Sequence, residues 1–333
     1  MWWQAPCVIV GPDQADSVSD RTQIRRDDVW LVTTSQPSQQ LWQQGVAVKA
    51  DAVLTLPADA ARLVDLLADM ADVADGAAVR GRVVGVVAGC GGAGASTVAA
   101  GLALQGLRSS STGAARASAP ADGSGHVLLV DADWLGGGLE LLMGCESAEG
   151  VRWPEVASTQ GRVAAAALRD ALLNADGVAL LTFDPVAFTV VQPEVMRSML
   201  DAGRRASGLV VVDLPRALDP SAREAVTRCD VVVVLGTGDV RAAAGIERVL
   251  GTVSPLCADV RLVVRRTSGA DLSPDELAAS VQLTLAGEVG TYRTLARAVN
   301  EGLGPGRSGR FARQCRRILD GLGTPVAARP GRS

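Results

Sequence analysis

Short apolar runs alternate with longer stretches of helical spacing along most of the chain. The runs are rich in valine and leucine and contain almost no polar positions, which is typical of strands buried on both faces of a parallel sheet. They occupy residues 82–88, 126–130, 178–183, 209–212, 231–235 and 260–264. Segments of helical spacing follow them at 98–107, 163–173, 193–206, 240–250 and 275–280. We therefore predict an α/β fold with a doubly wound, mostly parallel sheet.

The first 75 residues carry a smaller α/β pattern of their own. Its predicted elements are three strands and one helix, at residues 6–10, 29–33, 52–56 and 63–74. This pattern resembles a truncated receiver domain of two-component signalling. A receiver has an aspartate just after its central strand, whereas Thr33 and Thr34 stand there in this chain. We therefore expect a docking or dimerisation module rather than a phosphorylated switch.

Composition sets the remaining boundaries. Residues 76–81 are a predicted linker, 82–322 the main domain and 323–333 a flexible tail. Within the main domain, residues 109–125 are rich in serine, alanine and glycine without periodicity, which is typical of a surface loop. Four of the six tryptophans lie in the first unit, and they leave core packing and a partner surface open as alternatives: Trp2, Trp3, Trp30 and Trp42.

A glycine-dense turn joins the apolar run 82–88 to the helical stretch that follows it. Its spacing is G-x4-G-x-[ST], that of a P-loop, with Gly89 and Gly94 as the fixed glycines and Ser96 as the hydroxyl residue. Glycines at 91, 92 and 94 allow backbone N–H groups to approach phosphate oxygens closely. Ala95 stands where a P-loop has lysine. The turn therefore predicts a phosphate site without its usual cation.

Two acidic loops accompany this turn. Asp131 and Asp133 follow one apolar run, and Asp213 follows another. Because the carboxyl ends of parallel strands meet at one edge of a sheet, these side chains are expected beside the glycine loop. Carboxylate and hydroxyl oxygens suit Mg²⁺.

The three loops together resemble the deviant P-loop ATPases of the MinD/ParA group over residues 82–322, most of all the TadZ/CpaE branch and the actinobacterial septum-site-determining-like proteins. The resemblance implies ATP and Mg²⁺ as ligands. It assigns Ser96, Asp131 and Asp213 to the metal and Asp133 to orientation of the attacking water. Around the nucleotide it places the loop and one basic residue: Gly91, Gly92, Ala93, Gly94, Ala95, Ser96, Thr97 and Arg266.

The group uses two lysines in its glycine loop, which are Cys90 and Ala95 here. Phosphoryl transfer depends on cations, and one charge pair about 4 Å apart contributes roughly 4 kcal/mol at an effective dielectric near 20. We therefore expect a degenerate or very slow ATPase that binds ATP weakly or not at all. Its expected role is that of a spatial scaffold for the septum site or for polar pilus or secretion machinery. The alternative is an active Mg²⁺-dependent switch in which Arg216 or Arg241 replaces the lysines.

Composition argues against several other classes of functional site and of binding partner. A single histidine, His126, argues against a histidine triad or a multi-histidine metal site, and six scattered cysteines argue against a disulfide framework. A net charge of −4 gives no reason to expect a nucleic-acid partner. Without a signal peptide or a membrane-spanning run, we expect a cytoplasmic protein whose partners belong to the division or pilus machinery. Homodimerisation stays open. The basic amphipathic stretch 309–322 is expected to pack on the sheet, with peripheral membrane contact as the alternative.

Overall fold

The computed structural model describes most of the chain, which divides into two compact units, Met1–Ala78 and Val79–Ser333. The described residues are 5, 7–21, 29–36, 38–60, 62–64, 66–67, 81–110, 126–157, 168, 171–184, 186–187 and 189–323. Four of the predicted segments lie wholly or mainly outside them: the helices 63–74 and 163–173, the linker 76–81 and the tail 323–333. The same holds for most of the predicted loop 109–125.

The first unit is a small parallel sheet with two helices. Its strands β1 (Val8–Val10), β2 (Val29–Thr33) and β3 (Ala52–Thr55) pair in the order β1-β2-β3. The helices α1 (Pro12–Arg21) and α2 (Gln39–Ala47) were not predicted, because both are polar segments with little apolar periodicity. Trp30 is buried in this unit, whereas the Trp42 side chain is 55% exposed.

The strand order of the first unit bears on its function. Strands that follow each other in sequence are also neighbours in the sheet, so the described part has no topological switch point. Open α/β sheets bind ligands at such a point, which a receiver has between its first and third strands. Thr33 ends β2, at the position where the sequence lacks the aspartate of a receiver.

The second unit is built on a sheet of eight strands in the order β11-β10-β9-β4-β8-β5-β7-β6, in which only the β6–β7 pair is antiparallel. The predicted doubly wound, mostly parallel α/β fold is therefore confirmed. The strands are β4 (Arg82–Ala88), β5 (Val127–Asp131), β6 (Leu173–Ala175), β7 (Val178–Leu181), β8 (Leu209–Leu214), β9 (Val231–Thr237), β10 (Val260–Arg266) and β11 (Thr284–Gly290). Leu173, which we predicted to end a helix, instead begins the edge strand β6.

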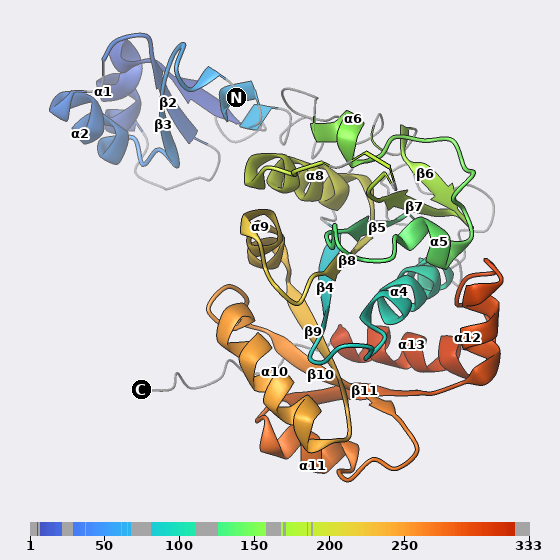
Figure 1. The fold of residues 1–333 in the computed structure, drawn as a ribbon. Coiled ribbons are helices and arrows are strands. Elements are labelled where there is room, and N and C mark those ends of the chain that lie inside the picture. Colours follow the sequence, from blue (N-terminus) through green and yellow to red (C-terminus); the bar gives the residue numbers. More distant parts are fainter. Residues whose placement is uncertain are drawn as a thin grey trace. The chain divides into compact units, whose positions relative to one another are not determined.

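Helices cover both faces of this sheet (Figure 1). They are α4 (Ala95–Ser110), α5 (Leu139–Met143), α6 (Trp153–Ala157), α8 (Pro193–Ala206), α9 (Pro220–Arg228), α10 (Val240–Val253), α11 (Pro274–Ser280), α12 (Arg293–Asn300) and α13 (Gly309–Leu322). The helices α4 and α13 pack on one face, and α8, α9, α10 and α11 on the other. Alternate residues of the central strands enter the two cores, as the continuous apolar runs require.

The last helix, α13, packs on the sheet as predicted. Its apolar stripe, which includes Phe311, Cys315 and Ile318, is buried against α4 and β11. Two glycines permit the close approach of α13 to α4 and β11. A Cβ on Gly101 of α4 would lie 2.7 Å from Cys315 Sγ, and one on Gly287 of β11 would lie 2.7 Å from Ile318 Cγ1. Among the described helices, none is both long enough and apolar enough to cross a bilayer.

Candidate functional site

The P-loop leads from β4 into α4 with the geometry of an anion site. The Gly89 N–H donates to the carbonyl of Leu235 at 2.8 Å, which fixes the start of the loop against β9. Gly92 and Gly94 have φ values of 71° and 94°, which side chains other than glycine rarely adopt. The first N–H groups of α4, from Ala95 onward, have no partner within the helix. These N–H groups and the helix dipole favour a phosphate.

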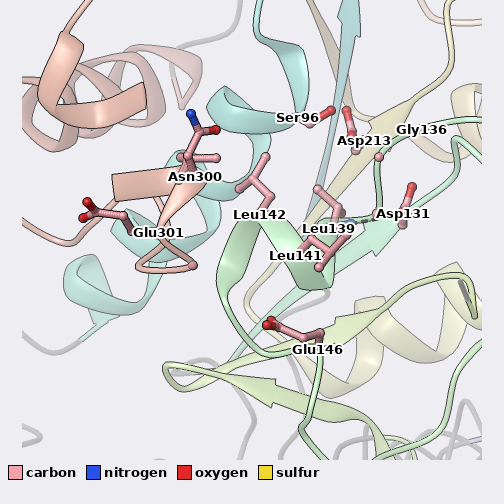
Figure 2. Close-up of a pocket in the computed structure, with 14 residues that line it drawn as sticks. Ser96, Asp131, Gly136, Leu139, Leu141, Leu142, Glu146, Asp213, Asn300 and Glu301 are labelled. Carbon is pink, nitrogen blue, oxygen red and sulfur yellow. Dashed lines mark hydrogen bonds between the residues drawn. The ribbon is translucent and has the colours of Figure 1, made fainter. Parts of the chain in front are cut away.

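A pair of buried carboxylates lies beside this loop. Asp131 of β5 and Asp213 of β8 are directly opposite each other in the sheet, with exposures of 2% and 4%. The Ser96 hydroxyl lies beside the Asp213 carboxyl (Figure 2), and its hydrogen-bonding effect opposes the rise of the Asp213 pKa. The Asp131 carboxylate accepts hydrogen bonds from the N–H of Asp133 at 3.1 Å, from Thr182 Oγ1 at 3.0 Å and from the N–H of Leu139 at 3.3 Å. The structure thus brings together the three residues predicted to hold the metal.

The electrostatics of the pair favour a cation. Burial, together with the neighbouring Asp131 charge, raises the pKa of Asp213 to about 8. Burial also raises the pKa of Asp131 to about 6, against the effect of its hydrogen bonds. None of the groups that influence these two carboxyls is a cationic side chain. A Mg²⁺ ion fits this donor set of two carboxylates and a hydroxyl, with phosphate and water oxygens as further ligands.

The described residues contain no group of three or more histidine, cysteine, aspartate or glutamate side chains placed to hold a metal ion. Water and the phosphates of a bound nucleotide would supply the rest of the coordination shell of a metal here. Magnesium ions are commonly held in this way, by one or two carboxylates and the phosphates of a substrate. The site is consistent with a metal that enters together with a nucleotide.

A cavity of about 660 Å³ opens above the carboxylate pair. Ser96, Asp131 and Asp213 line one side, and residues 299–302 at the end of α12 line another (Figure 2). Asp133 is not among the described residues that line it. Its carboxylate instead accepts a hydrogen bond of 3.2 Å from the N–H of Leu135.

The backbone of Asp131 is held by a tryptophan that sequence reasoning missed. Trp153 Nε1 donates to the carbonyl oxygen of Asp131 at 2.7 Å, and its own N–H donates to the carbonyl of Thr182 at 3.0 Å. The Trp153 side chain is fully buried and its ring lies 6.0 Å from that of Phe183. A tryptophan in a short segment of five helical residues gives no periodic signal, so only its bulk distinguishes it in the sequence.

Two arginines, one from β10 and one from the segment after β8, reach the P-loop. A Cβ on Gly94 would lie 3.6 Å from Nη1 of Arg265, and one on Gly91 would lie 3.9 Å from Nη1 of Arg216. Arg265 Nε is buried and has no hydrogen-bond partner among the described residues. A cation is therefore present at the loop although Ala95 replaces the lysine.

Arg266, which the resemblance assigned to the nucleotide, lies on the other face of β10 from Arg265. Its side chain is 70% exposed, and Nη1 is 3.5 Å from Glu288 Oε2. Successive strand residues point to opposite faces, so Arg265 shares the face of Val263, which packs in the core of α4 and α13. This period of two was the signal in the sequence that distinguishes the two arginines.

Comparison with known proteins gives the family. Residues 1–78 match the family model described as "Rv3660c-like, CheY-like N-terminal domain". The uncharacterised protein Rv3660c of Mycobacterium tuberculosis (strain ATCC 25618 / H37Rv) is 32% identical over 333 residues, which cover 100% of this chain and 90% of the relative. The chain belongs to the Rv3660c-like family. The equivalent protein of strain CDC 1551 / Oshkosh, MT3760, matches with the same identity and coverage.

Solved structures resemble the second unit of this Rv3660c-like protein. A ParA family ATPase from Chlorobium tepidum TLS superposes with a TM-score of 0.60 at 15% identity, covering 73% of this chain and 98% of that one. The MinC:MinD cell division protein complex of Aquifex aeolicus superposes with a TM-score of 0.58 at 19% identity, covering 75% of this chain and 98% of that one. The septum site-determining protein MinD from Pyrococcus horikoshii OT3, complexed with Mg-ADP, superposes with a TM-score of 0.56 at 17% identity, covering 72% of this chain and 95% of that one. At these identities the likeness shows the fold alone.

The Rv3660c-like chain thus joins a CheY-like N-terminal unit to a MinD/ParA-like P-loop fold. Its glycine loop and its two buried aspartates lie together at the carboxyl ends of β4, β5 and β8. The positions of the two group lysines are Cys90 and Ala95, and Arg265 and Arg216 approach the loop from β10 and from the segment after β8.

Proposed function

We propose that this Rv3660c-like protein is a nucleotide-dependent spatial regulator. In this proposal a Mg²⁺-bound adenine nucleotide occupies the P-loop and controls contacts with protein partners in the cytoplasm. The partners belong to the machinery that places the division septum or a polar pilus or secretion apparatus. The MinD/ParA-like fold supports the proposal, and so does the site at the carboxyl ends of its strands.

The observation that carries nucleotide binding is the guanidinium of Arg265 beside Gly94. Its Nε is buried and has no partner among the described residues, so this one N–H is desolvated without a compensating hydrogen bond. A phosphate in the backbone nest would supply that partner, because guanidinium groups bind phosphate oxygens through charge-assisted hydrogen bonds. Ser96, Asp131 and Asp213 would hold the Mg²⁺ ion, which neutralises phosphate charge when bound.

Replacement of Arg265 by alanine is expected to weaken Mg-ADP binding by about 10- to 100-fold, since loss of one charge-assisted contact corresponds to roughly 1.4–3 kcal/mol. Arg265→Lys should recover part of the affinity. Arg266→Ala is the matched control, because that neighbouring side chain is exposed and pairs with Glu288. Isothermal titration calorimetry measures the affinity for Mg-ADP of wild type and of the R265A, R265K and R266A variants. Equal affinity of R265A and wild type would refute the assignment of Arg265. Absence of Mg-ADP binding in wild type would refute the proposed function.

A second candidate function is an active ATPase switch, and the nearness of Arg216 Nη1 to Gly91 favours it. Arginine supplied to a phosphate site accelerates hydrolysis strongly in related chemistry. Asp133 would then orient the attacking water, although its carboxylate now accepts the Leu135 N–H. If the protein is a regulator and not an active switch, we expect it to hydrolyse Mg-ATP slowly, with a turnover rate of about 10⁻³ per second or less, as P-loop enzymes do without a catalytic arginine. Faster turnover that Asp133→Ala abolishes would favour the switch.

The position of the protein in the cell distinguishes the two proposed roles. A fluorescent fusion of the full chain should gather at the septum if it places division, or at one or both poles if it places pilus or secretion machinery. The R265A variant should lose this pattern while remaining folded, because its localisation would depend on the nucleotide. A uniform distribution of the wild-type fusion would contradict a spatial role of either kind.

A further inference from the structure

A second cavity adjoins the start of the P-loop, and neither carboxylate of the pair lines it. Its volume is about 830 Å³, within the range of small-molecule sites. Residues 89–91 of the P-loop line it together with Thr237, Asp239 and the first half of α10. Three arginine side chains also line it: Arg216, Arg241 and Arg248. We call it the arginine cavity.

The described residues that line the arginine cavity balance at most one of its positive charges. Arg241 and Arg248 are seven residues apart on α10, which is two helical turns, so both lie on the same side of the helix. All three arginines are exposed, and none of them forms an ion pair with a residue that the structure describes. Three cations therefore surround one cavity.

The one carboxylate among the lining residues, Asp239, is already committed. Its Oδ1 accepts the N–H of Ala242 at 2.9 Å, which caps α10, and its Oδ2 accepts the hydroxyl of Thr237 at 2.6 Å. These hydrogen bonds, and then the nearby Arg241 charge, hold the pKa of Asp239 below its ordinary value. Asp239 thus offsets one of the three positive charges at most.

We infer that the arginine cavity binds a small polyanion with at least two phosphate groups, at a site that adjoins the nucleotide site and shares Gly91 with it. Guanidinium groups bind phosphate oxygens in pairs, and a cavity of this size has room for more than one phosphate. A concave site with converging cations suits a small ligand better than the extended surface that a duplex nucleic acid requires.

The position of the cavity couples it to the P-loop. Cys90 Sγ lies 3.5 Å from Thr237 Oγ1, so the loop and the cavity wall share a contact. Arg216 follows Asp213 by three residues, so a ligand that holds Arg216 also restrains the segment next to the metal site. An anion in the cavity repels nucleotide phosphates at the nest. We therefore expect each ligand to weaken the other by the same factor, about five-fold. This coupling rests on the proposed function, whereas the cavity itself does not.

Inorganic triphosphate is the probe, titrated calorimetrically into the full-length chain. Wild type should bind it, and the double variant Arg241→Gln with Arg248→Gln should bind it at least about 10-fold more weakly. The charge-matched control is Arg223→Gln with Arg313→Gln, two exposed arginines on α9 and α13. This control should bind like wild type. R265A should keep the affinity of the cavity for the probe, because Arg265 does not line it.

Three outcomes would overturn the inference. The first is unchanged triphosphate binding in R241Q/R248Q. The second is loss of binding in R265A alone, which would place the probe in the P-loop and leave the proposed function intact. A 30-base-pair duplex DNA is tested in the same way. Tighter binding of the duplex than of triphosphate, through the same arginines, would also overturn the assignment of a small ligand. Circular dichroism of each variant confirms that it is folded.

Discussion

Replacement of Asp213 by asparagine is expected to stabilise the ligand-free protein by about 3 kcal/mol at pH 8 and by much less at pH 5. Burial beside Asp131 raises the pKa of Asp213 from 3.8 to about 8. Between these values the folded state binds a proton that the unfolded state has released. The free energy of unfolding of wild type therefore falls as pH rises through this window. Asparagine removes the titration while it keeps the shape of the side chain.

Urea unfolding at pH 5, 6.5 and 8 without Mg²⁺ measures this effect. The difference between D213N and wild type should grow steadily with pH. Asp320→Asn, an exposed position on α13, serves as the control and should follow wild type throughout. Millimolar Mg-ADP should then stabilise wild type and not D213N. A D213N protein that is less stable than wild type at pH 8 would contradict an uncompensated buried charge at this position.

Truncation of Trp153 to alanine is expected to lower the free energy of unfolding by about 3–5 kcal/mol, among the largest effects of a single core substitution. The indole is fully buried, and its Nε1 donates to the Asp131 carbonyl at 2.7 Å. Alanine leaves a large cavity and an unsatisfied carbonyl at the end of β5. We expect Mg-ADP affinity to fall as well, because that carbonyl belongs to a residue of the metal site.

Trp153→Phe separates the contribution of the buried ring from that of the Nε1 hydrogen bond. It retains most of the buried ring area and loses only the hydrogen bond, for which we expect about 1–2 kcal/mol. Trp42→Ala is the control, since that side chain is 55% exposed in the first unit. All three variants are compared with wild type by urea unfolding. A loss under about 1 kcal/mol for W153A would show that the surrounding core closes over the gap.

Much of the fold and part of the site could be predicted from the pattern of apolar runs. Central strands buried on both faces read as unbroken apolar segments, and β4, β8 and β9 were predicted for that reason. β11 was missed because Gly287 and Glu288 interrupt its sequence. The short helices α5 and α6 were missed because five residues do not complete two turns and show no periodicity.

The predicted metal residues came together because parallel strands place their carboxyl ends at one edge. Ser96, Asp131 and Asp213 each end a strand or begin the helix that follows one, so their positions depend on topology alone. The period of two in β10 shows which face Arg265 lies on, but its approach to the P-loop depends on the length of its side chain, which residue spacing does not reveal. The sequence therefore predicted that Ser96, Asp131 and Asp213 lie together and offered Arg216 as a replacement cation, but it did not point to Arg265.

The packing of α13 against α4 has a consequence for how the protein is made. The helix that begins at the P-loop is one of the first parts of its unit to leave the ribosome, and its partner helix is among the last. Until α13 arrives, Gly101 and the apolar residues near it have nothing to cover them on that side. The apolar face of α4 is thus covered late in translation, and the nascent chain exposes an apolar surface that chaperones would be expected to shield.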